Sequence, residues 1–117
     1  MKENNVVMEK AMAFAIRVVN LYKLLCERKE YVLSKQLLRS GTAIGALLKE
    51  SEHAQSRADF VSKLSIALKE ANESDYWIEL LYKTDYLSEK EFRSMIKDCE
   101  DLLKLLASIV KTIRLSK

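Results

Sequence analysis

The chain has 117 residues, of which 49 % are apolar, and it contains two glycines and no proline. This length suits one domain, and the scarcity of turn residues excludes both a disordered chain and an all-β domain. Twenty lysines and arginines balance 17 aspartates and glutamates, so the net charge of +3 permits binding to nucleic acid without requiring it.

The first expected element is an amphipathic helix over about residues 5–27. Its apolar side chains recur at steps of three and four residues, which predicts one wide stripe toward a core. The stripe consists of Val7, Ala11, Phe14, Ala15, Val18, Tyr22 and Leu25. Charges at Glu9, Lys10 and Arg17 interrupt the apolar stretch that a signal peptide or a membrane span needs, and no other window is apolar enough to span a membrane. We therefore expect a cytoplasmic protein with no membrane partner.

A second helix is expected after a short charged connection, and it ends near residues 51–54. One of its faces is apolar and consists of Leu37, Gly41, Ile44 and Leu48. Gly41 and Gly45 are four residues apart, a spacing that lets another helix backbone come close, although each costs about 1 kcal/mol relative to alanine. Because Ile44 and Leu48 continue the stripe, close packing is favoured over the alternative, a local break in the helix.

Ser56 and Asp59 predict the start of a third helix, because they form a variant of the capping box. The core series of this helix alternates steps of four and three, which is typical of a left-handed bundle, and consists of Phe60, Leu64, Ala67, Ala71, Ser74, Ile78 and Leu81. Ser88 and Glu91 predict a full capping box for a fourth helix. Its stripe consists of Phe92, Met95, Ile96, Cys99, Leu102, Leu103, Leu106, Ile109, Val110 and Ile113.

These four segments, joined by short connections, predict an all-α fold, an antiparallel up-down-up-down four-helix bundle in which residues 1–117 form one domain. In such a bundle Cys26 and Cys99 are too far apart along the axis for a disulfide, so we expect two free thiols. The acidic residues Glu70, Glu73, Asp75 and Glu79 are expected to form solvated ion pairs or interface contacts. Lys69 is at helical pairing distance from Glu73.

The sequence predicts no catalytic site, cofactor, metal site or small-molecule substrate. Glu50 and His53 have the Glu-x-x-His spacing of di-iron bundles, but those sites need two such motifs and the chain has one histidine. We expect a solvated His53, with a metal site completed across an oligomer axis as the alternative. The histidine has no partner in a hydrolase motif, and no glycine-rich phosphate loop is present.

A second apolar face is expected on the third helix, directed away from its core series. It consists of Ile66, Tyr76, Trp77 and Leu80. Ile16 and Leu24 lie similarly off the stripe of the first helix. Because one bundle uses one stripe per helix, the extra face either meets another subunit or remains exposed, and we expect self-association.

Basic residues line up on the fourth helix opposite its core stripe, where they form a candidate phosphate-binding surface. They are Lys90, Arg93, Lys97, Lys104, Lys111 and Arg114, with Lys117 extending the basic end. Glu100 and Asp101 interrupt the row, and no aromatic side chain is interleaved for base stacking. The alternative is an ordinary solvated face.

Two segments carry a family resemblance. Residues 38–46 (LRSGTAIGA), followed by Glu50, and residues 59–77 (DFVSKLSIALKEANESDYW) resemble the four-helix-bundle protein family encoded in bacterial ribosomal-RNA intervening sequences. A related branch comprises the accessory proteins of diversity-generating retroelements. The resemblance implies an up-down-up-down bundle that assembles into a ring-like homopentamer, and it transfers no catalytic residue.

Two hypotheses for function follow. The first is a non-catalytic, oligomeric accessory protein that binds structured RNA, DNA or a nucleic-acid-processing protein through basic helix faces. The alternative is a purely structural or protein-interaction scaffold that does not bind nucleic acid. An enzyme would need a site built between subunits from Glu50, Glu70 or His53, and we do not expect one.

Overall fold

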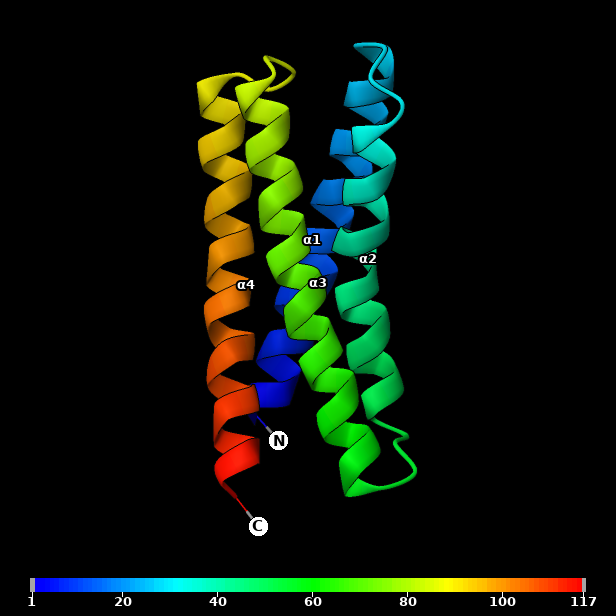
Figure 1. The fold of residues 1–117 in the computed structure, drawn as a ribbon, viewed down its shortest axis with the longest axis vertical. Coiled ribbons are helices and arrows are strands. Elements are labelled where there is room, and N and C mark those ends of the chain that lie inside the picture. Colours follow the sequence, from blue (N-terminus) through cyan, green and yellow to red (C-terminus); the bar gives the residue numbers. More distant parts are fainter. Residues whose placement is uncertain (1, 117) are drawn as a thin grey trace.

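The computed structural model describes residues 2–116, and these residues form four helices with short connections (Figure 1). The helices are α1 (Lys2–Glu27), α2 (Leu33–Ser51), α3 (Arg57–Lys83) and α4 (Glu89–Leu115). Consecutive helices run in opposite directions along a long axis of 47 Å. The predicted all-α, up-down-up-down bundle is confirmed, although α1 begins earlier than the expected residue 5.

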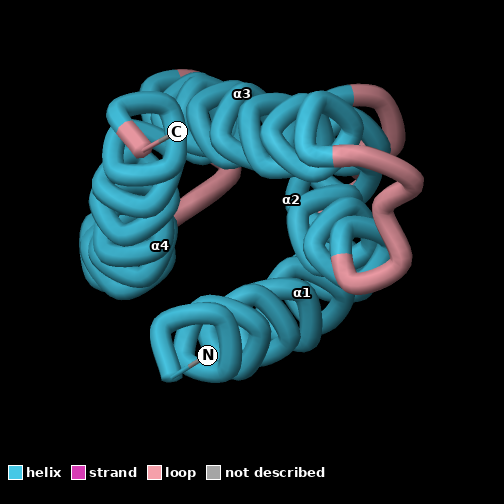
Figure 2. Tube along the Cα trace, turned by 90° about the horizontal axis from the view of Figure 1, so that it is seen from below, coloured by secondary structure: helices cyan, strands magenta, loops and turns pink. Residues whose placement is uncertain are grey.

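The helices surround the core in chain order, as the view along the bundle shows (Figure 2). α3 packs closely against both α2 and α4, and α1 packs closely against α2. The seam between α1 and α4 closes the bundle and has the fewest contacts of the four. A groove of about 270 Å³, lined by residues that include Leu21, Leu24 and Met95, lies along this seam.

The core is built from the predicted stripes. In α3 every predicted position except Phe60, which is half-buried, is fully enclosed, and in α4 the buried positions are Met95, Cys99, Leu102, Leu106, Ile109 and Val110. The wide stripe of α1 is buried at its centre, whereas Ala15 and Tyr22 on its edge are half-buried. Within the described residues, no helix is long and apolar enough to cross a membrane.

Both predicted N-caps are present. The Ser56 Oγ accepts a hydrogen bond from the Asp59 N–H at 3.0 Å, and an Asp59 carboxylate oxygen accepts one from the Gln55 N–H at 3.1 Å. At α4 the Ser88 Oγ accepts from the Glu91 N–H, and Glu91 Oε1 accepts from the Ser88 N–H at 2.8 Å. These bonds satisfy backbone donors that have no partner inside the helix.

α2 begins differently, with a cap that the sequence analysis did not identify. Its N-cap residue is Val32, which has no capping side chain. Instead the buried Glu30 carboxylate accepts hydrogen bonds from the N–H groups of Val32, Leu33 and Ser34 at 3.2, 3.0 and 2.5 Å. Burial raises the pKa of Glu30, but these bonds outweigh it and the pKa lies below its ordinary value.

Two helices end on a residue in the left-handed region that favours glycine. Lys29 follows α1 with φ of 66°, and Asp85 follows α3 with φ of 70°. The N–H groups of Lys29 and Glu30 donate back to the carbonyls of Cys26 and Leu25, both at 2.9 Å. The same pair of bonds follows α3. Each terminus is therefore a Schellman motif made without glycine.

α2 is continuous through both of its glycines, which face α1. A Cβ built on Gly41 would lie 2.8 Å from Cγ2 of Val18, closer than real contacts allow. A Cβ on Gly45 would lie 3.7 Å from Ala11, at ordinary van der Waals distance. Close approach of the two helices therefore depends on the missing side chain at Gly41 and not at Gly45.

Candidate nucleic-acid interface and assembly surfaces

α4 carries basic side chains along the face that points away from the core. All six predicted residues are exposed, namely Lys90, Arg93, Lys97, Lys104, Lys111 and Arg114. The four lysines recur every seven residues, so successive ones are about 10.5 Å apart along the helix axis. We call these four the lysine row. Lys117, the expected extension, lies outside the described residues.

Part of this basic face is neutralised by neighbours on the same helix. Arg93 pairs with Glu89 at 2.8 Å, and Lys97 pairs with Asp101 at 2.9 Å. The Asp101 carboxylate raises the pKa of Lys97 above its ordinary value. Among the described residues, three lysines of the row make no ion pair within 4.0 Å: Lys90, Lys104 and Lys111.

The predicted second apolar face of α3 is partly exposed. The exposed fraction is 58 % for Tyr76 and 39 % for Ile66, and Leu80 is half-buried. Trp77 differs from the expectation, because it packs against the core and its ring meets Tyr76 edge-on at 5.0 Å. The surface available to another protein is therefore smaller than the helical wheel of α3 indicates.

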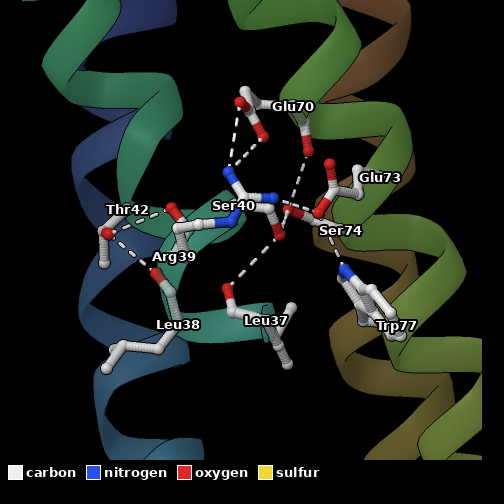
Figure 3. A network of polar contacts seen from close by, with 9 residues as sticks. All are labelled: Leu37, Leu38, Arg39, Ser40, Thr42, Glu70, Glu73, Ser74 and Trp77. Atoms are coloured by element: carbon white, nitrogen blue, oxygen red, sulfur yellow. Dashed lines mark hydrogen bonds and ion pairs between the residues drawn. The ribbon is translucent and has the colours of Figure 1, made fainter. Parts of the chain in front are cut away.

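An ion-pair network ties Trp77 to α2 (Figure 3). Trp77 Nε1 donates to the Glu73 carboxylate at 2.9 Å, and Arg39 of α2 donates to the same carboxylate. Arg39 also donates to both carboxylate oxygens of Glu70, at 3.2 and 3.3 Å. The bond from Trp77, followed by the Arg39 contact, lowers the pKa of Glu73. Two residues of the acidic cluster of α3, Glu70 and Glu73, thus bind the neighbouring helix α2, and Glu73 pairs with Arg39 rather than with Lys69. Glu79 pairs with Lys83 on its own helix.

α1 contributes a further apolar surface. Met12 and Ile16 are 62 % and 55 % exposed, one turn apart on the side of α1 that faces away from the core. Leu24 does not belong to this surface, because it is half-buried and packs against the core, contrary to the expectation for an off-stripe residue. The bundle therefore presents exposed apolar side chains on both α1 and α3.

The residues considered for metal or catalytic chemistry do not converge. His53 is exposed in the turn after α2, and Glu50 pairs with Lys63 at 3.2 Å. The described residues contain no group of three or more histidine, cysteine, aspartate or glutamate side chains that could hold a metal ion. Cys26 and Cys99 are free thiols, and burial raises the pKa of Cys99 to about 12.

Comparison with known proteins gives two matches. A sequence model described as 23S rRNA-intervening sequence protein matches residues 3–108. The 1.70 Å crystal structure of a protein of unknown function from the S23 ribosomal protein family of Bacteroides thetaiotaomicron VPI-5482 is 56 % identical, with a TM-score of 0.90 over 93 % of this chain and 98 % of that one. No curated protein sequence matches. The chain belongs to the family of 23S rRNA-intervening sequence proteins.

Proposed function

We propose that this protein is a non-catalytic, self-associating helical bundle that binds structured RNA through the lysine row of α4. The observation that carries the proposal is the regular exposure of the four lysines on one face over some six turns of helix. Three of them have no ion pair among the described residues, so their charges are available to phosphate groups.

Self-association strengthens this proposal. One row carries a modest charge, and five copies of it in the homopentamer implied by the family resemblance would add to a field strong enough to concentrate RNA. The absence of aromatic side chains from the row favours recognition of the RNA backbone and its shape over reading of individual bases.

The experiment compares two charge reversals of equal size by fluorescence anisotropy with a structured RNA at about 50 and 200 mM salt. Lys90→Glu with Lys104→Glu alters the row, and Lys23→Glu with Lys35→Glu alters exposed lysines of α1 and α2. We expect the row variant to weaken binding at least tenfold and to make the salt dependence shallower by about one unit per lost phosphate contact.

The control variant is expected to bind within about threefold of the unaltered protein, since its lysines lie on other helices. Equal losses in the two variants, or no binding at 50 mM salt, contradict the proposal. A duplex DNA of unrelated sequence in parallel titrations measures preference for RNA.

The exposed apolar residues support a second candidate function, a protein-interaction scaffold without RNA binding. Tyr76 on α3 and Met12 on α1 have the highest exposed fractions of their surfaces. Light scattering of Tyr76→Glu and Met12→Glu identifies which surface holds the assembly together, because a buried carboxylate at an interface is costly. An intact assembly that binds no RNA favours the scaffold, and a mass of 13.5 kDa at micromolar concentration excludes self-association.

A further inference from the structure

An open groove of about 660 Å³ lies between the beginning of α3 and the end of α4. Its polar lining consists of two arginines and three serines. Arg57, Ser62 and Ser65 come from α3, Arg114 comes from α4, and Ser116 follows α4. Val61 and Ile113 supply apolar surface between them. Among the described residues, none with a side-chain carboxylate belongs to the lining.

Internal hydrogen bonds hold both guanidinium groups in place. Arg57 Nη2 donates to the main-chain carbonyls of Ile113 and Ser116, both at 2.6 Å, and so closes the end of α4. Arg114 Nη2 donates to the Ser65 Oγ at 3.0 Å. A guanidinium carries five N–H donors, and each of these groups uses only Nη2 for the bonds seen. Neither arginine has an ion pair among the described residues, so each retains its charge and spare donors.

The charge of the side chains along the seam between α3 and α4 changes from positive at the groove to negative farther along. About 15 Å beyond Ser65 along the α3 axis, Asp75 lies near two other carboxylates, those of Glu79 and Glu100. Burial, followed by repulsion from Glu100 and Glu79, raises the pKa of Asp75. An anion is therefore repelled from the middle of the seam and attracted to the groove that contains the arginines.

We propose that this groove binds one nucleotide unit, with the phosphate between Arg57 and Arg114 and the ribose or base against Val61 and Ile113. Planar guanidinium groups match phosphate oxygens in pairs, and serine hydroxyls supply further donors. Lys111, the last lysine of the row, precedes Arg114 of the groove by three residues, about one turn of α4. The inference rests on the proposed function in one respect: the nucleotide comes from an RNA strand that continues along the row. A free nucleotide offers the groove the same phosphate, ribose and base as a nucleotide within an RNA strand.

Calorimetric titration of the full chain with adenosine 5′-monophosphate, adenosine and inorganic phosphate tests the site. We expect the monophosphate to bind more tightly than either fragment. Arg114→Gln should weaken its binding about tenfold, which corresponds to the loss of one charge-assisted hydrogen bond. Arg114→Lys should recover part of the lost affinity, because lysine keeps the positive charge but lacks the paired N–H donors of the planar guanidinium.

Two control variants distinguish direct contact between Arg114 and the ligand from structural support and from a general loss of positive charge. Ser65→Ala removes the support of Arg114 but leaves its guanidinium, and we expect a loss of only two- to threefold. Lys35→Gln removes an exposed cation of α2, outside both the groove and the basic face of α4, and should change nothing. Equal affinity for phosphate and the monophosphate, or equal losses in Arg114→Gln and Lys35→Gln, overturns the assignment.

The source of the nucleotide is decided with a 5′-phosphorylated oligoribonucleotide. Tighter binding of the strand than of the monophosphate, reduced by Lys90→Glu with Lys104→Glu, supports RNA as the source. Monophosphate binding without RNA binding refutes the proposed function and leaves the groove as a site for free nucleotides. RNA binding without any monophosphate binding overturns the groove assignment and leaves the proposed function standing.

Discussion

Ser40 of α2 and Ser74 of α3 share a hydrogen bond of 2.9 Å between their hydroxyl oxygens, and both side chains are fully buried. The Ser74 Oγ donates to the Glu70 carbonyl at 2.9 Å, so its single proton is used there. Ser40 is therefore the donor of the shared bond. Its other acceptor, the Leu37 carbonyl, is 3.4 Å away. The two substitutions that break this bond are not equivalent.

Ser74→Ala should destabilise the bundle by about 1 to 2 kcal/mol, because it leaves the buried Ser40 hydroxyl with only a long bond. Ser40→Ala should cost less, about 0.5 to 1 kcal/mol, since Ser74 keeps its acceptor. The double variant should cost less than the sum of the two. Urea unfolding of the three variants measures these differences, and strictly additive free energies would show that the two hydroxyls are not coupled.

The two glycines of α2 should respond oppositely to alanine. Gly41→Ala places a methyl group 2.8 Å from Val18 and should destabilise the fold by about 1 to 3 kcal/mol. Gly45→Ala has room and should stabilise it by about 0.5 to 1 kcal/mol, the usual gain in a helix interior. Thermal unfolding measures both. Val18→Ala in the Gly41→Ala background should cost less than Val18→Ala alone, and a full additional loss would rule out the clash.

Acid should weaken the bundle through Glu91. Its carboxylate binds the Arg28 guanidinium at 2.9 and 2.7 Å, and Arg28, followed by the Ser88 N–H, lowers its pKa from 4.5 to about 2. The folded pKa is below the unfolded one, so this stabilisation is complete above pH 4.5 and is lost as the pH falls toward 2.

Glu91→Gln should therefore lower the melting temperature at pH 6 and flatten its decline between pH 4.5 and about 2. Thermal melts across this range measure the effect. Glu89→Gln is the matched control, because among the described residues Glu89 pairs with Arg93 of its own helix and with no other helix. A decline in Glu91→Gln as steep as in the unaltered protein would assign the acid sensitivity to other groups.

Glycine should improve both left-handed helix ends. Lys29→Gly and Asp85→Gly each relieve a strained backbone that costs about 1 kcal/mol, and the gain is reduced by the greater freedom of glycine in the unfolded chain. We expect a net stabilisation of about 0.5 kcal/mol each, measured by urea unfolding. Lys83→Gly, inside the last turn of α3, should destabilise by about 1 kcal/mol and is the opposite-sign control.

Much of the fold follows from patterns that are local in sequence. The caps at Ser56 and Ser88 each depend on residues within one turn, and the stripes of α3 and α4 follow from helical periodicity alone. Such signals do not depend on how the helices are placed relative to one another. They predict the elements, their order and the centre of the buried stripe.

The predictions were wrong or incomplete where a residue's environment depends on a neighbouring helix. A helix in this bundle has two neighbours, so its buried arc is wider than its central stripe and includes Leu24 and Trp77. Arg39 reaches Glu73 only because of the register between α2 and α3, which no single-helix pattern contains. Glu30 was missed because it caps α2 from a position before the N-cap, where capping rules do not apply.

The seam between α1 and α4 has a dynamic consequence. Beyond apolar packing it is held by Arg17, which binds Asp98 and Ser94, and by the Arg28 pair with Glu91. These ion pairs and hydrogen bonds are at the surface, where salt weakens the attraction between the charges. α3, which has a closely packed helix on each side, is protected. Amide hydrogens of α1 should therefore exchange with solvent sooner than those of α3, and the bundle opens first along the line where its two ends in sequence meet.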